Sequence, residues 1–225
     1  MKQTRAEKAR QTRKRMREAA RDLFVNVGYG ETTMDQIARE ADVAVQTLYY
    51  TFRTKGQLLR EVVEATAAGE EDAPPVPERP WMRELLSSDS AQRVLALMVE
   101  HGTDIYARAA PLWPAVHAAA AADPEVGRYW DHVNNGRRAG QRQIVARLAE
   151  LGTLRDGLDV NRATDLVVLL HGHDSYRGLV LDAGWPVVEY KAWAFRTLVL
   201  QLLARTRLVS GAYAKLSFAD WVVVA

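Results

Sequence analysis

The chain has 225 residues, of which 48% are hydrophobic and 26% are charged, and it contains no cysteine. This hydrophobic content allows a folded core and excludes a chain that is disordered throughout. Without cysteine there is no disulfide, no thiolate metal ligand and no cysteine nucleophile. The apolar runs are far shorter than the roughly 18 residues of a membrane span, and no signal-peptide pattern is visible. We therefore expect a cytoplasmic protein without a membrane segment.

The small net charge of +2 hides an uneven distribution of charged residues. Residues 1–60 carry 13 Lys and Arg against 7 Asp and Glu, whereas the rest of the chain carries 17 against 21. A basic N-terminal part beside a mildly acidic remainder indicates that the N-terminal part meets a polyanion. A solvated basic helix without a partner explains the charge alone equally well.

The N-terminal part has the apolar spacing and the capping residues of four helices. Apolar side chains recur three and four positions apart before Gly28, a residue that favours the left-handed end of a helix. Thr33 and Gln36 have the spacing of a capping box. Thr54 and Gln57 repeat that spacing. The predicted helices run over about 5–27, 34–40, 45–52 and 54–68.

The remainder of the chain begins with an acidic, proline-rich stretch, residues 69–80, which predicts a loop. Beyond it the apolar pattern is again helical, with Pro124 at a helix start, Asn161 as an N-cap and Gly184 in a break. The segment 211–225 is ambiguous between a frayed end and an added strand. The predicted helices run over about 90–109, 112–122, 125–150, 161–182 and 187–206.

These patterns predict an all-α protein with about nine helices in two domains. Residues 1–54 form a three-helix, helix-turn-helix DNA-binding domain, and helix 54–68 is the connector. Residues 69–225 form a larger helical domain for ligand binding and dimerisation.

The spacing of the second and third helices is typical of a DNA-reading motif. In a helix-turn-helix the first helix braces across the DNA backbone and the second presents its N-terminal side chains to base edges in the major groove. Gln46 suits a paired hydrogen bond to adenine, and Val45 or Thr47 suits contact with a thymine methyl group. The predicted phosphate contacts are Thr33, Tyr49, Tyr50 and Lys55.

At these residues the sequence resembles the DNA-binding domain of the TetR family of repressors. Asp42 stands where that pattern usually has glycine, and Ala44 replaces the usual hydroxyl N-cap, which costs about 1 kcal/mol of local helix stability. The matching positions are Gly28, Tyr29, Thr33, Ile37, Ala38, Ala41, Val43, Leu48, Tyr49, Phe52, Lys55, Leu58 and Leu59.

The resemblance extends more loosely over residues 123–204 and implies a homodimer. The helices at about 161–182 and 187–206 are expected to pair with their copies in a four-helix bundle. Both are apolar on more than one side, as a helix must be if it covers its own core and a partner. Two-fold pairing would place two recognition helices about 34–36 Å apart, opposite successive major grooves of palindromic operator DNA.

The resemblance also implies a pocket for a small-molecule effector of unknown identity within the helices at 90–180. A pocket of this kind has apolar walls and a few convergent polar groups. Each candidate residue also has an ordinary structural explanation, as a core aromatic, a core histidine or a surface charge. The candidates are His101, Asp104, Tyr106, Trp113, His117, Trp130, Asn134, Arg138, His171, Asp174 and Ser175.

We expect no metal and no cofactor. Two histidines two positions apart on one helix, such as His171 and His173, point about 200° apart and do not share an ion. No phosphate loop, nucleophile elbow or zinc-protease motif is present, so an enzyme is not expected. An architectural DNA-binding protein and a transcriptional activator stay open as alternatives. The preferred interpretation is a repressor whose ligand tilts helix 54–68 and lowers operator affinity. The acidic balance of the second domain favours a neutral or cationic effector.

Overall fold

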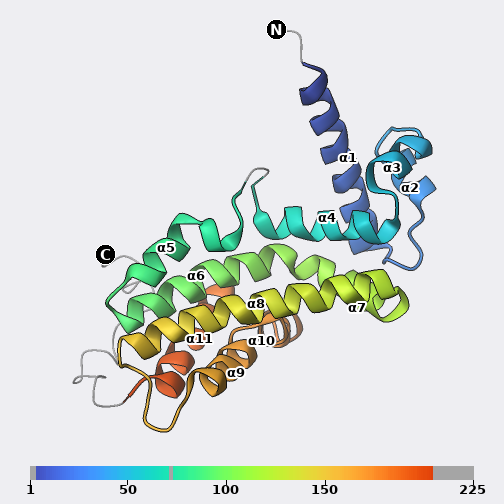
Figure 1. Cartoon of the computed structure of the whole chain (residues 1–225). Helices are drawn as coiled ribbons and strands as arrows, with labels where there is room; N and C mark the ends of the chain where they lie inside the picture. The colour runs from blue at the N-terminus through green and yellow to red at the C-terminus, as the bar shows by residue number, and fades with distance from the viewer. Residues whose placement is uncertain (1–3, 71–72, 205–225) are drawn as a thin grey trace. The chain divides into compact units, whose positions relative to one another are not determined.

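The computed structural model describes residues 4–70 and 73–204 (Figure 1). Within these two ranges the regular structure is helical, apart from one antiparallel bridge between Leu154 and Leu203. This confirms the all-α prediction for the described residues. The ambiguous segment 211–225 lies outside them. None of the helices in the described residues is both long and apolar enough to cross a membrane.

The chain divides into two compact units. As described, the first unit comprises residues 4–70 and 108–134, and the second comprises residues 73–107 and 135–204. Two long helices, α6 (Ala91–Ala109) and α8 (Pro124–Glu150), contribute residues to both units. The first unit is therefore larger than the expected DNA-binding domain, and the functional division at residues 54 and 69 stays a prediction.

The first unit holds the helix-turn-helix. Figure 1 shows the short helices α2 and α3 beside α1, with α4 running past the foot of α1. The helices predicted over about 34–40 and 45–52 have these limits in the structure. The elements are α1 (Arg5–Asn26), α2 (Met34–Glu40), α3 (Val45–Phe52), α4 (Lys55–Ala68), η2 (Ala110–Leu112), α7 (Trp113–Ala122) and the beginning of α8.

The core of the first unit fixes α3 in place. Leu48 and Phe52 are the inward residues of α3, and their exposed fractions are 0% and 1%. They belong to one hydrophobic cluster with Ile37 of α2 and Leu58 and Leu59 of α4. Burying a side chain of this size contributes about 1.5–3 kcal/mol. The same apolar spacing that makes α3 a helix thus decides which of its faces is left outside.

The second unit contains one helix that the sequence pattern missed. Residues 69–80 were expected to form a loop, but a helix begins at Pro80 because proline is tolerated in the first helical turn. The elements of this unit are η1 (Val76–Glu78), α5 (Pro80–Ser87), most of α6, the rest of α8, α9 (Val160–Leu170), α10 (His173–Tyr176), the π-helical segment η3 (Arg177–Asp182) and α11 (Val187–Leu202).

The prediction of one continuous helix over 161–182 is wrong. Helix α9 ends at Leu170, His171 leaves helical geometry at φ −131° and ψ 75°, and Gly172 is extended. Asp159, not Asn161, is the N-cap, because its side chain accepts from two backbone N–H groups. The predicted helix is thus divided into α9, the short α10 and the π-helical segment η3.

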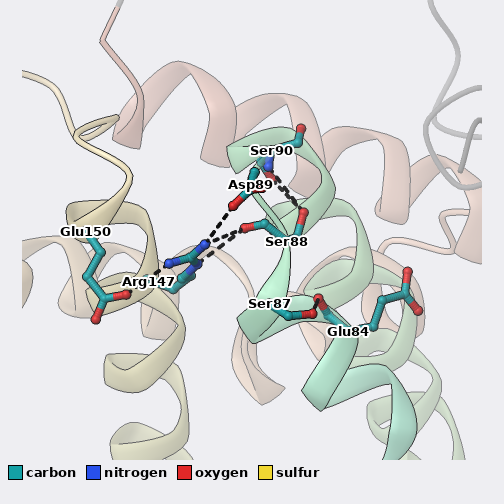
Figure 2. Close-up of polar contacts among 7 residues, drawn as sticks. All are labelled: Glu84, Ser87, Ser88, Asp89, Ser90, Arg147 and Glu150. Atoms are coloured by element: carbon teal, nitrogen blue, oxygen red, sulfur yellow. Dashed lines mark hydrogen bonds and ion pairs between the residues drawn. The ribbon is translucent and has the colours of Figure 1, made fainter.

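Arg147 ties the C-terminal part of α8 to the loop between α5 and α6 (Figure 2). Its guanidinium donates to the Ser88 carbonyl from Nη2 at 3.1 Å and from Nε at 3.3 Å. It also forms ion pairs with Asp89 at 3.1 Å and Glu150 at 3.2 Å. A guanidinium that satisfies a loop carbonyl in this way fixes the loop before α6 against α8.

Candidate nucleic-acid interface and ligand site

The outward face of α3 carries the side chains that the sequence assigned to DNA. Gln46, Thr47, Tyr49 and Tyr50 are exposed. The exposed fraction of Tyr49 is 49% and that of Tyr50 is 90%, which is unusual for large aromatic residues. Val45 is half-buried against the core. A short helix with this exposed face has the geometry for major-groove contact.

The turn before α3 has the conformation that its residues suggested. Thr33 and Gln36 form the expected capping box at the start of α2. Asp42 has φ 52°, the left-handed geometry that aspartate tolerates. Ala44 is the N-cap of α3 and makes no side-chain capping bond. The first N–H groups of α3 are consequently left without a side-chain cap.

Lys55 has a structural role that the sequence pattern did not indicate. Its Nζ donates to the backbone carbonyls of Tyr29 at 2.7 Å and Thr32 at 2.8 Å. It also lies 4.3 Å from the centre of the Tyr29 ring, within cation–π range. Burial lowers the pKa of Lys55, and the Asp123 and Glu31 carboxylates oppose that shift. An ammonium has three donors, so a phosphate contact by the third stays a prediction.

The start of α8 is joined to both ends of the helix-turn-helix. Asp123, the residue before α8, accepts a hydrogen bond from the Tyr29 hydroxyl at 3.0 Å. Burial, followed by the Asp123 carboxylate, raises the pKa of Tyr29, so this hydroxyl stays protonated as a donor. The Thr54 hydroxyl donates to Glu125 at 3.0 Å while accepting from the Gln57 N–H. These bonds couple α8 to the N-terminus of α4 inside the first unit.

Replacing Tyr29 with phenylalanine is expected to lower the free energy of unfolding by about 1–3 kcal/mol. The change keeps the ring but leaves the half-buried Asp123 carboxylate without its hydroxyl donor. Tyr50→Phe is the matched control. Because Tyr50 is exposed, loss of its hydroxyl group should change the free energy of unfolding by less than about 0.5 kcal/mol. Chemical denaturation measures both, and equal stabilities for the two variants would contradict the coupling.

The predicted ligand residues fall into both units. Trp113 is buried in the first unit, and His117 is exposed and meets the Trp130 ring edge-on at 5.4 Å. Asn134 is half-buried in the same unit. The remaining candidates, His101, Asp104, Tyr106, Arg138, His171, Asp174 and Ser175, lie in the second unit.

Three candidates of the second unit lie on its surface or in other contacts. Arg138 is exposed and forms an ion pair with Asp165, and Asp174 is exposed on α10. His101 stacks on Trp81 of α5, with 4.7 Å between ring centres. Burial lowers the pKa of His101, and nearby carboxylates, Asp104 first, oppose that shift. The contacts of Arg138 and His101 and the exposure of Asp174 explain these side chains without a ligand, so their roles in ligand binding stay a prediction.

Tyr106 and His171 meet at the centre of the second unit, where the predicted helix is broken. The Tyr106 hydroxyl donates to the His171 carbonyl at 3.2 Å, and Gln141 Nε2 donates to the same carbonyl at 3.3 Å. The His171 ring contacts the Thr103 hydroxyl through Nε2 at 3.1 Å. The carbonyl that would continue α9 is therefore held by side chains from α6 and α8, which explains why α9 ends at this residue.

His171 is a buried, neutral histidine. Its exposed fraction is 1%, and burial is the main cause that lowers its pKa to about 3. The positive charge of Arg137 acts in the same direction, whereas a hydrogen bond to the Val99 backbone opposes the shift. A Cβ atom at Gly102 would lie 2.6 Å from the ring, so glycine at this position makes room for the histidine.

Several residues of this centre were not among the predicted ligand contacts. Arg137 and Gln141 are four positions apart on α8, in line with buried Val145 and Leu148. That helical spacing is a signal that could have favoured Arg137 over its neighbour Arg138. The aromatic residues His173, Tyr176 and Tyr190 complete the surroundings of Tyr106 and His171.

The second unit also exposes large apolar side chains. Leu169 of α9 is 68% exposed, Val188 of α11 is 66% exposed and Leu200 of α11 is 62% exposed. Leu181, in the π-helical segment, is 48% exposed. Exposed apolar side chains concentrated on neighbouring helices are typical of a protein–protein contact surface.

Comparisons with known proteins agree with this geometry. Residues 17–62 match the family of bacterial regulatory proteins called the tetR family. The HTH-type transcriptional regulator TtgW of Pseudomonas putida is 40% identical over 58 residues, which are 26% of this chain and 43% of that protein. The HTH-type transcriptional regulator YdeS of Bacillus subtilis is 25% identical over 184 residues, 76% of this chain and 87% of that protein. The chain thus spans less than half of TtgW.

Solved structures show the same fold over most of the chain. A transcriptional regulator from Saccharomonospora viridis, crystallised with choline, has a TM-score of 0.67 at 18% identity and covers 87% of this chain and 99% of its own. NalD of Pseudomonas aeruginosa, a repressor of a multidrug efflux pump, has a TM-score of 0.66 at 20% identity and covers 88% of this chain and 98% of its own. The N-terminal helix-turn-helix therefore matches the tetR family over residues 17–62, as its motif indicated, and the solved structures share the fold of most of the chain.

Proposed function

We propose that the protein is a homodimeric transcriptional repressor that binds palindromic operator DNA and is released by a small-molecule effector. The observation that carries the proposal is the face of α3, where exposed Gln46, Thr47, Tyr49 and Tyr50 stand on a rigidly packed core. The basic charge of residues 1–60 supports it, because a DNA-binding surface gains affinity from phosphate contacts.

The dimer is supported by the exposed apolar residues of α9 and α11. A stable interface needs a contiguous apolar core, and Leu169, Val188 and Leu200 supply side chains for one. Two-fold symmetry then presents two α3 helices to the two halves of a palindrome. The break at His171 changes the expected surface, since α9 and α11 take the place of two long helices.

The effector is proposed to bind in the second unit, around Tyr106 and His171. The fold neighbour crystallised with choline supports a ligand of small-molecule size, and NalD, a repressor by its description, supports repression over activation. Binding would tilt α4 and change the separation of the two recognition helices, with a coupling free energy of about 1–3 kcal/mol. A ligand-independent architectural role is the second candidate, but a second unit with a polar centre favours the sensor.

Two substitutions on α3 separate base reading from phosphate contact. Gln46→Ala is expected to relax the preference at one base pair of each half-site, a loss of about 1–3 kcal/mol of discrimination. Tyr49→Ala is expected to weaken binding to all sequences, because a phosphate contact carries no sequence information. Competition binding with operator and random DNA measures both effects at fixed salt.

The control for both variants is Asp35→Asn, at an exposed position of α2 outside the predicted contacts. Equal losses on operator and random DNA for Gln46→Ala would remove its base-reading role. Unchanged affinity for all DNA in both variants would contradict the proposed interface on α3.

A further inference from the structure

A positive charge inside the second unit has no carboxylate beside it. Arg137 is half-buried, and its Nε and Nη1 atoms are shielded from solvent and have no hydrogen-bond partner among the described residues. None of the ion pairs among the described residues includes Arg137. A guanidinium stays protonated in proteins, and a buried charge without a partner is costly. An anionic ligand would therefore stabilise the Arg137 guanidinium.

Three acidic residues of the second unit are already paired with other cations. Lys191 of α11 forms ion pairs with Glu100 at 2.7 Å and with Asp104 at 2.8 Å, both on α6. Asp165 is paired with Arg138 on the surface. None of these three carboxylates forms an ion pair with the Arg137 guanidinium.

A second polar group on the same face of α8 as Arg137 is also unmatched. Its guanidinium lies beside the Tyr106 hydroxyl, and its Nη1 is 3.1 Å from where a Cβ of Gly172 would stand. Gln141 Oε1 is buried without a hydrogen-bond partner among the described residues, on a residue that is 6% exposed. Buried polar atoms are normally satisfied, so these unmatched atoms of Arg137 and Gln141, four positions apart on α8, indicate a binding site.

Aromatic rings surround these polar atoms. The ring centre of Tyr106 is 6.4 Å from that of Tyr176, which is 5.3 Å from that of Tyr190. The Tyr190 hydroxyl in turn bonds Ser175 at 3.0 Å. Rings of this kind provide apolar wall for a ligand, and the few polar atoms fix its orientation.

We infer that Arg137 binds the carboxylate of the effector, and that the effector is an organic acid with an aromatic or alkyl body that packs against the tyrosine rings. The inference rests on the proposed effector role and names its ligand class. The carboxylate accepts charge-assisted hydrogen bonds from the guanidinium. Gln141 Oε1 accepts from a hydroxyl or N–H group of the same ligand. The local charge around Arg137 replaces the expectation of a neutral or cationic effector drawn from the charge of the whole domain.

The test is equilibrium binding by calorimetry to the full-length protein without DNA. The probes are benzoate, 1-naphthoate and decanoate, with benzamide and benzyltrimethylammonium as the neutral and cationic counterparts. At least one carboxylate is expected to bind saturably and about tenfold or more tighter than its amide. Arg137→Gln should weaken that binding about tenfold or more, whereas Arg138→Gln, the exposed neighbour, should leave it unchanged within about twofold.

Thermal unfolding of the ligand-free variants shows that the loss is not a folding defect. Arg137→Gln removes an uncompensated charge, so its melting temperature should equal or exceed that of the parent protein. Absence of binding for all three carboxylates, or equal binding by Arg137→Gln and the parent, overturns the inference.

A separate DNA measurement distinguishes failure of the inference from failure of the proposed function. Operator release by the amide or the ammonium probe, with none by the carboxylates, overturns the carboxylate site and leaves the repressor standing. Carboxylate binding that depends on Arg137 but never changes operator affinity supports the site and contradicts its role as a sensor.

Discussion

Replacing Leu169 with glutamate is expected to yield a folded monomer that has lost most of its affinity for operator DNA. Leu169 is 68% exposed on α9, so the change costs little in the isolated chain. In a two-fold interface the same change occurs twice, and each copy places a charge in an apolar contact. Loss of the second half-site contact lowers operator affinity by about 100-fold or more. Analytical ultracentrifugation and operator titration measure the two effects together.

Val25→Glu is the control for this variant, since Val25 is an exposed apolar residue of α1 in the first unit. It introduces the same charge at a similar apolar site and should leave the oligomeric state unchanged. A Leu169→Glu protein that remained dimeric would exclude the α9 and α11 surface as the interface. A monomer with unchanged operator affinity would contradict the requirement for two recognition helices.

Acid is expected to destabilise the protein through His171. Burial holds its pKa at about 3, whereas a histidine in the unfolded chain has a pKa near 6.5. Above about pH 6.5 the residue is neutral in both states and contributes no pH dependence. Below that value the unfolded chain takes up a proton that the folded protein does not, so stability falls as the pH falls. The expected loss from this residue at pH 5 is about 2 kcal/mol relative to pH 7.5.

The measurement is the free energy of unfolding as a function of pH for the parent and for His171→Gln. The variant should be less stable at pH 7.5 but should lack most of the decline between pH 6.5 and 5, since it has no imidazole to protonate. His132→Gln, at an exposed position of α8, is the control and should keep the parent slope. Parallel curves for His171→Gln and the parent would show that His171 is not buried as a neutral ring.

The helix-turn-helix was predictable because local signals there agree with the packing. The capping box of Thr33 and Gln36 sets the start of α2, and the left-handed Asp42 sets the turn. The spacing of Leu48 and Phe52 then fixes the buried face of α3, and with it the exposed side chains. Each of these features is determined by residues a few positions apart in the chain, so a single sequence is enough to predict it.

The centre of the second unit was not predictable in the same way. The run from Leu166 to Leu170 favours a helix that continues, and only contacts from distant residues stop it. The His171 carbonyl is held by Tyr106 and Gln141, which lie 65 and 30 positions earlier in the chain. No local pattern reports such a contact. The choice of Arg138 over Arg137 has a different cause, because the helical spacing of Arg137 with Gln141 and buried Val145 was a local signal that the prediction did not use. Helix α5 was missed because its proline-rich start has the composition of a loop.

Selection of binding sites from random duplex DNA by the full-length protein tests the central claim most directly. We predict enrichment of a near-palindrome whose half-sites are read by α3, with centres about 34–36 Å apart or slightly more. Binding to that sequence should fall steeply with added salt, because phosphate contacts release counterions. Recovery of sequences without a common motif, at an affinity equal to that for random DNA, would contradict the account of a sequence-specific dimeric repressor.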